Sequence, residues 1–166
     1  MTPPMDPEHW SNGPRHGARG VVMSAGSILL LEYTVDDEKL YLFPGGGHEP
    51  GETFLETAVR EVHEETGLTV AARRFLMVHE FQPSKNPPIP SDVKSAYYGD
   101  AHRVDFYFLC DVLGSTEPHM NNNPDPLHTG FEWVRPDELS NWPVVPEIDD
   151  KLEAALGTDS DPLLME

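Results

Sequence analysis

Cysteine, basic side chains and long apolar runs are all scarce in this chain of 166 residues. Only 11 lysine and arginine residues stand against 29 aspartate and glutamate residues, which gives a formal net charge of −18. A surface this acidic repels nucleic-acid phosphates and anionic membranes, because binding to either depends on lysine and arginine side chains. The charge therefore predicts no polymeric nucleic acid and no membrane among the partners.

The single cysteine, Cys110, excludes a disulfide within one copy of the chain and favours a reducing compartment. The longest strongly apolar run covers only residues 28–31, whereas a membrane-spanning helix needs about 20 such residues. Residues 1–14 lack the basic segment followed by an apolar one that marks an export signal. These absences predict a soluble, cytoplasmic protein.

The length suits one compact domain, because single domains commonly contain roughly 100–200 residues. Prolines are frequent near the N-terminus, and a short polar segment follows the last helical pattern. Both ends are therefore predicted to lie outside the core. The expected organisation is an N-terminal tail at 1–16, a working domain at 17–156 and a C-terminal tail at 157–166. The sequence favours no oligomeric state over another, a homodimer included.

Strand and helix patterns are mixed along the domain. Pro44 and the three glycines after it are expected to allow neither strand nor helix, and Pro146 is expected near the first position of the last helix. The alternation in residues 103–112 predicts a strand with one face buried more deeply than the other. The pattern as a whole predicts an α/β (α+β) fold with a mixed sheet and helices packed on it. Strands are expected over residues 21–23, 28–33, 40–43, 69–81, 103–112 and 131–134, and helices over 54–66 and 146–156.

The segment 54–66 carries its own start and stop signals. Thr53 and Glu56 have the spacing of a capping box, and Gly67 stands where a helix commonly ends in a left-handed residue. At the angular spacing of an α-helix, three glutamates fall on one narrow face beside an apolar stripe. The glutamates are Glu61, Glu64 and Glu65, and the stripe is Leu55, Ala58, Val59 and Val62.

Carboxylates three or four residues apart on a helix repel one another, and Arg60 is the only basic neighbour of this cluster in the sequence. A solvated acidic face is the simpler interpretation, but a divalent cation would neutralise the repulsion directly. Carboxylate oxygens suit Mg²⁺ or Mn²⁺, which take further ligands from substrate phosphates. The chemistry expected of such a site is phosphoryl transfer to water.

The stretch 46–68 resembles a known signature. It contains Gly46, then Glu52 after five residues, and then Arg60–Leu68 after seven more. These residues match every position of the Nudix box, the signature of the Nudix hydrolases. Two flanking stretches, 43–46 and 131–139, are similar to the usual family lead-in and ending, so a weaker resemblance covers most of residues 17–156.

The resemblance implies an αβα sandwich with a mixed β-sheet that uses divalent metal to hydrolyse a nucleoside diphosphate linked to another moiety. It also implies a metal ligand at the carbonyl of Gly45 and a role for Glu52, together with Arg60, in orienting the loop and the helix. The implied cofactor is Mg²⁺, with Mn²⁺ as a second choice. The implied catalytic residues are Arg60 and the three glutamates that bind the metal, Glu61, Glu64 and Glu65.

The identity of the general base is left open by the sequence. Many relatives carry a further glutamate in the loop before the tryptophan that corresponds to Trp133, and this chain has none there. Asp125, His128 or Glu132 are alternatives, and so is a glutamate of the helix 54–66. A base must lie within hydrogen-bond distance of the attacking water, which a sequence does not show.

The candidate substrate residues are Arg19, Glu52, Pro83, Tyr97, Tyr98 and Arg103. Pro83 lies sixteen residues after Gly67, a spacing similar to that of family members acting on ADP-ribose; a chance match in a proline-rich segment is the alternative. The two tyrosines suit stacking on a base or simple packing. An arginine in the cleft would be a candidate phosphate contact.

These features together predict a divalent-metal-dependent hydrolase whose partner is a small nucleotide. ADP-ribose or a nucleotide sugar is slightly favoured, with sanitation of nucleoside triphosphates and cleavage of dinucleoside polyphosphates close behind. The alternative is a non-catalytic nucleotide-binding sensor or regulatory module with the same fold.

Overall fold

The structure, a computed structural model, describes residues 13–82, 85 and 102–158. Within these residues no helix is long and apolar enough to cross a membrane. The helices are α2 (Phe54–Thr66), the 3₁₀ helix η1 (Pro136–Asn141) and α4 (Asp149–Leu156). The strands are β1 (Arg15–Ser24), β2 (Ser27–Val35), β3 (Glu38–Leu42), β4 (Gly45–Gly47), β5 (Val70–Phe81), β6 (Arg103–Val112) and β7 (His128–Val134).

The strands form one mixed sheet in the order β3-β2-β1-β6-β5. β1 and β6 pair in parallel, with Arg15 opposite Arg103 and Met23 opposite Asp111, and the other pairs are antiparallel. β4 pairs with the first half of β1, and β7 pairs with β2. The predicted mixed sheet is confirmed.

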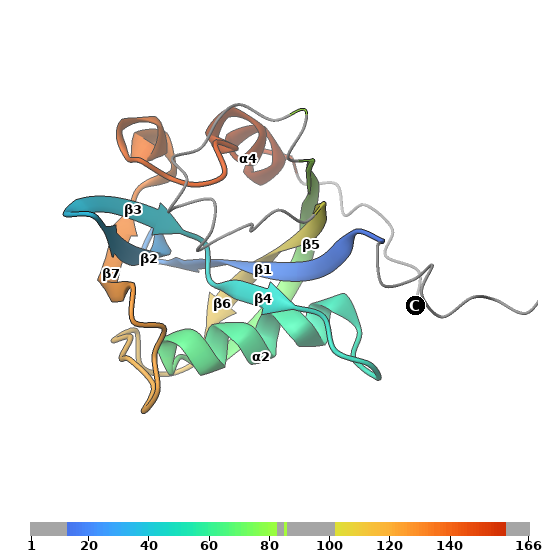
Figure 1. Ribbon diagram of the computed structural model, residues 1–166, viewed down its shortest axis with the longest axis horizontal. Helices are drawn as coiled ribbons and strands as arrows, with labels where there is room; N and C mark the ends of the chain where they lie inside the picture. The colour runs from blue at the N-terminus through green and yellow to red at the C-terminus, as the bar shows by residue number, and fades with distance from the viewer. Residues whose placement is uncertain (1–12, 83–84, 86–101, 159–166) are drawn as a thin grey trace, which may run out of the picture.

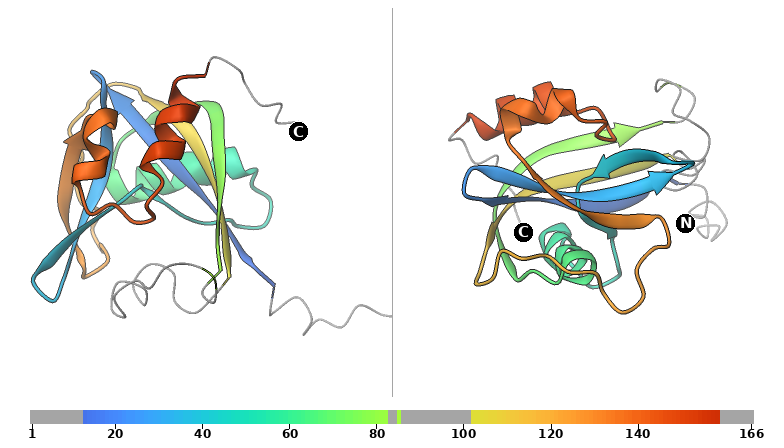
Figure 2. Two further views of the ribbon diagram at one scale, coloured as in Figure 1. Left: turned by 90° about the horizontal axis from the view of Figure 1, so that it is seen from above. Right: turned by 90° about the vertical axis from the view of Figure 1, so that its left-hand side faces the viewer.

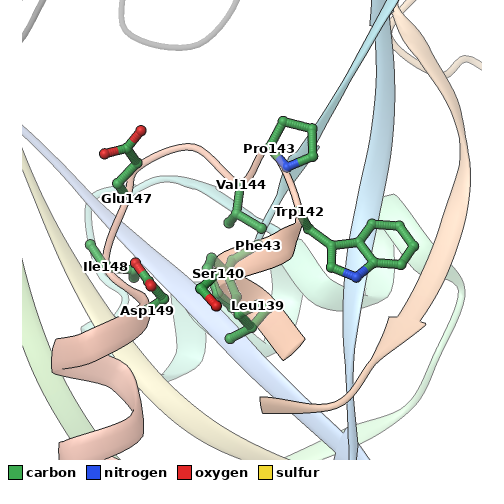
Figure 3. A pocket seen from close by; sticks show the side chains of 9 residues that line it. All are labelled: Phe43, Leu139, Ser140, Trp142, Pro143, Val144, Glu147, Ile148 and Asp149. Carbon is green, nitrogen blue, oxygen red and sulfur yellow. The ribbon is translucent and has the colours of Figure 1, made fainter. Parts of the chain in front are cut away.

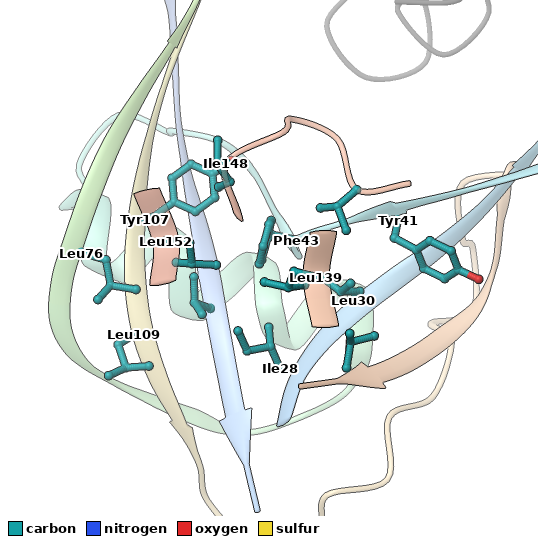
Figure 4. Close-up of a cluster of buried hydrophobic side chains, with 13 residues drawn as sticks. Ile28, Leu30, Tyr41, Phe43, Leu76, Tyr107, Leu109, Leu139, Ile148 and Leu152 are labelled. Carbon is teal, nitrogen blue, oxygen red and sulfur yellow. The ribbon is translucent and has the colours of Figure 1, made fainter. Parts of the chain in front are cut away.

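Helices cover both faces of this sheet. α2 packs on one face, while η1 and α4 pack on the other (Figure 1, Figure 2). The larger apolar cluster lies beneath η1 and α4 (Figure 4) and includes Leu76, Leu109, Leu139 and Leu152. A second cluster joins the sheet to α2. The αβα sandwich implied by the resemblance is therefore confirmed.

The expectation that no strand forms after Pro44 is wrong. Gly45–Gly47 forms the short strand β4, in which Gly45 lies opposite Arg19 and Gly47 opposite Gly17. The pairing is close, because a Cβ on Gly45 would lie 2.3 Å from the carbonyl oxygen of Ala18. Glycine therefore permits the strand here instead of ending it.

α2 begins and ends at the predicted residues. Thr53 and Glu56 form a complete capping box, and Gly67 ends the helix in the left-handed region with φ of 69°. This agreement follows from the local nature of the signals, since caps act within a few residues of each helix end.

The predicted apolar stripe of α2 is only partly right. Ala58 and Val62 are fully buried, but Leu55 is 37% exposed. Two threonines outside the predicted stripe, Thr57 and Thr66, are buried. Thr57 donates a hydrogen bond to the carboxylate of Glu52, and Thr66 donates one to the carbonyl of Val62. Both buried hydroxyl groups therefore have a partner, although a hydropathy pattern would not place threonine in the interior.

Three further expectations are corrected. β6 is buried on both faces at its centre, from Tyr107 to Cys110, because α2 covers one face and α4 the other. The last helix begins at Asp149, and Pro146 lies before it. β1 begins at Arg15, inside the segment expected as a tail.

Candidate active site

β4 lies between α2 and β1 and carries no side chains. A Cβ on Gly46 would lie 2.5–2.6 Å from the carboxylate atoms of Glu61. Such a separation is far below van der Waals contact, so any side chain at this position would displace the carboxylate of Glu61. The helix and the glycine strand are thus in direct contact at the predicted site.

Glu65 connects α2 to β4. Its Oε2 atom accepts a hydrogen bond of 2.8 Å from the backbone N–H of Gly45. Burial raises the pKa of Glu65 to about 7, and this effect exceeds the opposing effects of the Arg19 charge and the Gly45 N–H. A carboxyl group in this state exchanges a proton near neutral pH.

Arg60 holds the loop before α2 against the helix. Its Nε donates to Glu52 Oε1 at 2.6 Å, and Nη2 donates to Glu52 Oε2 at 3.1 Å and to the Gly47 carbonyl at 3.0 Å. The hydrogen bonds from Arg60 are the main reason why the pKa of the Glu52 carboxyl group is lowered to about 2. Arg60 thus joins the loop to the helix, and an orienting role of Arg60 and Glu52 in catalysis stays a prediction.

Arg60 also faces two of the three glutamates of α2. Its Nη1 donates to Glu61 at 2.8 Å and to Glu64 at 3.3 Å. Burial raises the pKa of Glu61, although Arg60 opposes the shift. The side chain of Glu64 is 54% exposed, the most open of the three.

The chemistry of this donor set fits a divalent cation. The negative charge of Glu64 raises the pKa of Glu61 and of Glu65 further. A divalent cation beside the three carboxylates would have the opposite effect and favour their ionised forms. Among the described residues, no three His, Cys, Asp or Glu side chains are arranged to hold a metal ion. Glu61 and Glu64 bond instead to Arg60, and metal binding would require them to turn away from it, whereas Glu65 bonds to Gly45 through Oε2 alone.

Arg19 lies on the other side of β4. Its Nη1 donates to the carbonyls of Phe43 at 3.2 Å and Gly45 at 3.0 Å, and the residue is only 4% exposed. The buried carboxylate of Asp105 lies 3.6 Å from Arg19 Nε. Arg19 therefore supports the backbone before α2 and does not face open solvent.

Arg103 also pairs with Asp105, through two hydrogen bonds of 3.0 Å from its Nε. A Cβ on Gly17 would lie 2.6 Å from the Gly46 carbonyl and 2.9 Å from Arg103 Nη2, so this guanidinium lies close to β4. Of the other candidate substrate residues, Pro83, Tyr97 and Tyr98 lie outside the described part of the chain.

The three alternative bases outside α2 lie in or just before β7. His128 is buried, stacks on Tyr33 and contacts the Gly130 carbonyl at 3.0 Å, and burial lowers its pKa. Asp125 accepts from the N–H of Leu127 at 2.9 Å in the turn before β7. Glu132 lies opposite Leu30. In the described residues no hydrogen bond joins any of the three to a glutamate of α2.

Sequence reasoning missed the segment that covers the end of α2. Asn121 Nδ2 donates to the Glu64 carbonyl at 2.9 Å, and the His119 N–H donates to the Thr66 carbonyl at 2.8 Å. The His119 ring lies where a Cβ on Gly67 would be, 2.0 Å from that position. No sequence pattern of residues 114–130 indicates these contacts. Asp105 was missed too, although an acidic residue in an apolar strand is a usable signal.

A cavity of about 260 Å³ lies on the sheet face opposite α2 (Figure 3). Phe43 lines it and leads within two residues to Gly45. The cavity has aromatic, aliphatic and acidic walls, formed by Phe43, Leu139, Ser140, Trp142, Pro143, Val144, Glu147, Ile148 and Asp149.

A family model described as the NUDIX domain matches residues 14–155. The chain belongs to the NUDIX family. This membership confirms the resemblance of residues 46–68 to the Nudix box. Nudix hydrolases as a family use divalent metal ions and act on small nucleotide substrates.

A curated relative is "Phosphatase NudJ" of Escherichia coli (strain K12), which is 37% identical over 68 residues. The matched part is 40% of this chain and 44% of that protein, so the match spans less than half the length of the relative.

Solved structures share the NUDIX fold over most of the chain. A NUDIX hydrolase from Nitrosomonas europaea matches with a TM-score of 0.67 and 17% identity, over 92% of this chain and 94% of that one. An ADP-ribose pyrophosphatase from Streptococcus suis 89-1591 matches with a TM-score of 0.60 and 20% identity, over 90% and 97%. At these identities the likeness shows the fold.

Proposed function

We propose that this NUDIX protein is a divalent-metal-dependent hydrolase of the diphosphate bond in a small nucleoside-diphosphate derivative. One observation carries the proposal: the carboxylates of α2 face the backbone of β4, where Glu65 accepts the Gly45 N–H at 2.8 Å and Glu61 contacts Gly46. Hard oxygen donors thus gather beside Arg60, and a divalent ion held by them would draw an anionic phosphate to the site.

Glu61, Glu64 and Glu65, with the Gly45 carbonyl, are the groups that would hold the metal. Mg²⁺ is our first choice and Mn²⁺ the second, because all the donors are hard oxygens. A bound divalent ion supplies charge neutralisation at the phosphates and lowers the pKa of a coordinated water.

The residues around the donors position them. Arg60 bonds to Glu52 and to the Gly47 carbonyl, and these bonds hold β4 and the loop after it in a fixed position relative to α2. We propose a glutamate of α2 as the general base, in preference to Asp125, His128 or Glu132. The choice rests on position, since these glutamates lie beside the groups that would hold the metal, and in the described residues no hydrogen bond joins the other three candidates to them.

For the substrate we favour ADP-ribose or a nucleotide sugar, ahead of nucleoside triphosphates and dinucleoside polyphosphates. The spacing of Pro83 supports this order, and so do the names of two structural neighbours, an ADP-ribose pyrophosphatase and a UDP-X diphosphatase. Arg103, close to β4, is our candidate phosphate contact, and Tyr97 and Tyr98 are our candidates for stacking on the base.

The deciding experiment is a substrate panel with the full chain in Mg²⁺, in Mn²⁺ and in chelator. The panel contains ADP-ribose, nucleotide sugars, nucleoside triphosphates, dinucleoside polyphosphates and coenzyme A. We expect metal-dependent cleavage, fastest with ADP-ribose or a nucleotide sugar. Nucleotide binding without any cleavage would contradict the proposal and favour the non-catalytic sensor.

A further inference from the structure

Asp105 is an acidic residue inside the sheet, with a side chain that is 1% exposed. Two guanidinium groups pair with it, Arg19 at 3.6 Å and Arg103 at 3.0 Å. Arg19 is buried as well and reaches the carbonyls of Phe43 and Gly45. A charged connection therefore runs from β6 through β1 to the backbone that precedes α2.

The strand β4 depends on such support, because it consists of glycine and has no side chains to anchor it. At Gly45 the support comes from two sides. Glu65 accepts the N–H at 2.8 Å from the side of α2, and Arg19 donates to the carbonyl at 3.0 Å from the other side. With both backbone groups bonded, the direction of the Gly45 carbonyl is fixed.

Arg19 in turn depends on Asp105. A buried guanidinium without a counter-charge is strongly unfavourable, so the carboxylate keeps Arg19 in place. Asp105 also offsets the positive charge of Arg19 beside the Gly45 carbonyl, the proposed metal ligand. Without Asp105, that charge would repel a divalent cation at the same carbonyl.

We propose that Asp105 and Arg19 are positioning residues for the hydrolysis, which direct the Gly45 carbonyl and balance the charge beneath it. The proposal rests on the proposed function, since it concerns the same site. It gives Arg19 a different role from the phosphate contact expected from the sequence. Neither residue touches the substrate in this proposal; both act through Gly45.

The test compares two variants of the full chain. Asp105→Asn keeps the shape of the side chain and removes its charge. Arg19→Lys keeps the charge, but its single nitrogen does not reproduce the fork that spans two carbonyls and a carboxylate. The matched controls, Asp111→Asn on the same strand and Arg73→Met, each remove an ion pair of 2.9 Å at the surface.

Each protein is assayed for kcat and KM in Mg²⁺, and for Mn²⁺ affinity by electron paramagnetic resonance in the absence of substrate. In the two test variants we expect kcat to fall at least about 10-fold, with weaker Mn²⁺ binding, because a small misplacement acts on the chemical step. In Arg19→Lys we expect KM to stay within about 2-fold of wild type, whereas in Asp105→Asn it should rise as well, because Asp105 also holds Arg103, the proposed phosphate contact. The controls should match wild type in all three quantities.

Wild-type kcat and Mn²⁺ affinity in a folded Asp105→Asn protein would overturn the proposal. If circular dichroism shows that Asp105→Asn does not fold, Arg19→Lys decides alone, and an unchanged kcat and Mn²⁺ affinity there overturns it equally. If the wild-type protein cleaves no substrate, the proposed function fails, whereas the Mn²⁺ measurement still decides the positioning role.

Discussion

The backbone N–H of Gly45 donates a hydrogen bond of 2.8 Å to Oε2 of Glu65, twenty residues later in the chain. This bond joins the glycine strand to the helix that carries the acidic cluster. The carboxyl group is buried, and burial raises its pKa to about 7. The same group therefore ties the site together and exchanges a proton near neutral pH.

Replacing the acidic groups of α2 should abolish turnover without unfolding the protein. We expect Glu64→Gln and Glu65→Gln to lower kcat by about 100-fold or more, the range found when a metal ligand or general base is lost. Glu56→Gln is the control for an acidic residue of the same helix outside the cluster. Unchanged turnover in both variants, measured by phosphate release, would contradict the catalytic assignment.

The stability of the metal-free protein should depend on Glu65 and pH. Burial raises the pKa of this group from 4.5 to about 7, so the folded protein binds the proton more tightly than the unfolded chain. The resulting stabilisation is complete below pH 4.5 and is lost as the pH rises to about 7. Urea unfolding in chelator should therefore show wild type losing stability relative to Glu65→Gln across this window. A difference independent of pH would refute the shift.

The glycines of β4 should differ in their tolerance of a methyl group. A Cβ on Gly46 would lie 2.5 Å from Glu61, whereas a Cβ on Gly47 would meet no atom within 4 Å. We expect Gly46→Ala to lower kcat by about 10-fold or more, since Glu61 must move, and Gly47→Ala to stay near wild type. Equal activities of the two variants would mean that the contact with Glu61 does not matter.

Removing divalent cations should weaken substrate binding as well as stop cleavage. The chain has a net charge of −18, and the proposed substrate is itself an anion. Because this charge repels the substrate, we expect its affinity to fall by about 10-fold or more in chelator. Isothermal titration calorimetry with a non-hydrolysable ADP-ribose analogue measures this change. Tight binding without metal would be inconsistent with the proposed mechanism.

Local signals in the sequence predicted the central part of the fold. α2 has the predicted bounds because Thr53 and Gly67 terminate it through contacts within a few residues. Once the bounds of the helix were known, the angular spacing of its residues predicted that the three glutamates share one face. These features depend on neighbouring residues alone, which a sequence displays directly.

Features that depend on distant partners were not predictable in the same way. β4 forms because the glycines pair closely with β1, and hydropathy does not encode that approach. Hydropathy also did not show that Leu55 lies partly exposed or that Thr57 is buried, where its hydroxyl group bonds to Glu52. Arg19 was a candidate substrate residue in the sequence, and it lies buried beside Asp105, which is far along the chain and provides its counter-charge.

The pairing of Arg19 with Asp105 also bears on how the protein folds. The two residues belong to parallel neighbours, β1 and β6, which come together only when distant parts of the chain meet. Contacts of large sequence separation form slowly, whereas a helix such as α2 forms quickly. Recovery of activity after denaturation should thus lag behind recovery of helical circular dichroism, which makes catalysis a stricter reporter of a fully assembled sheet.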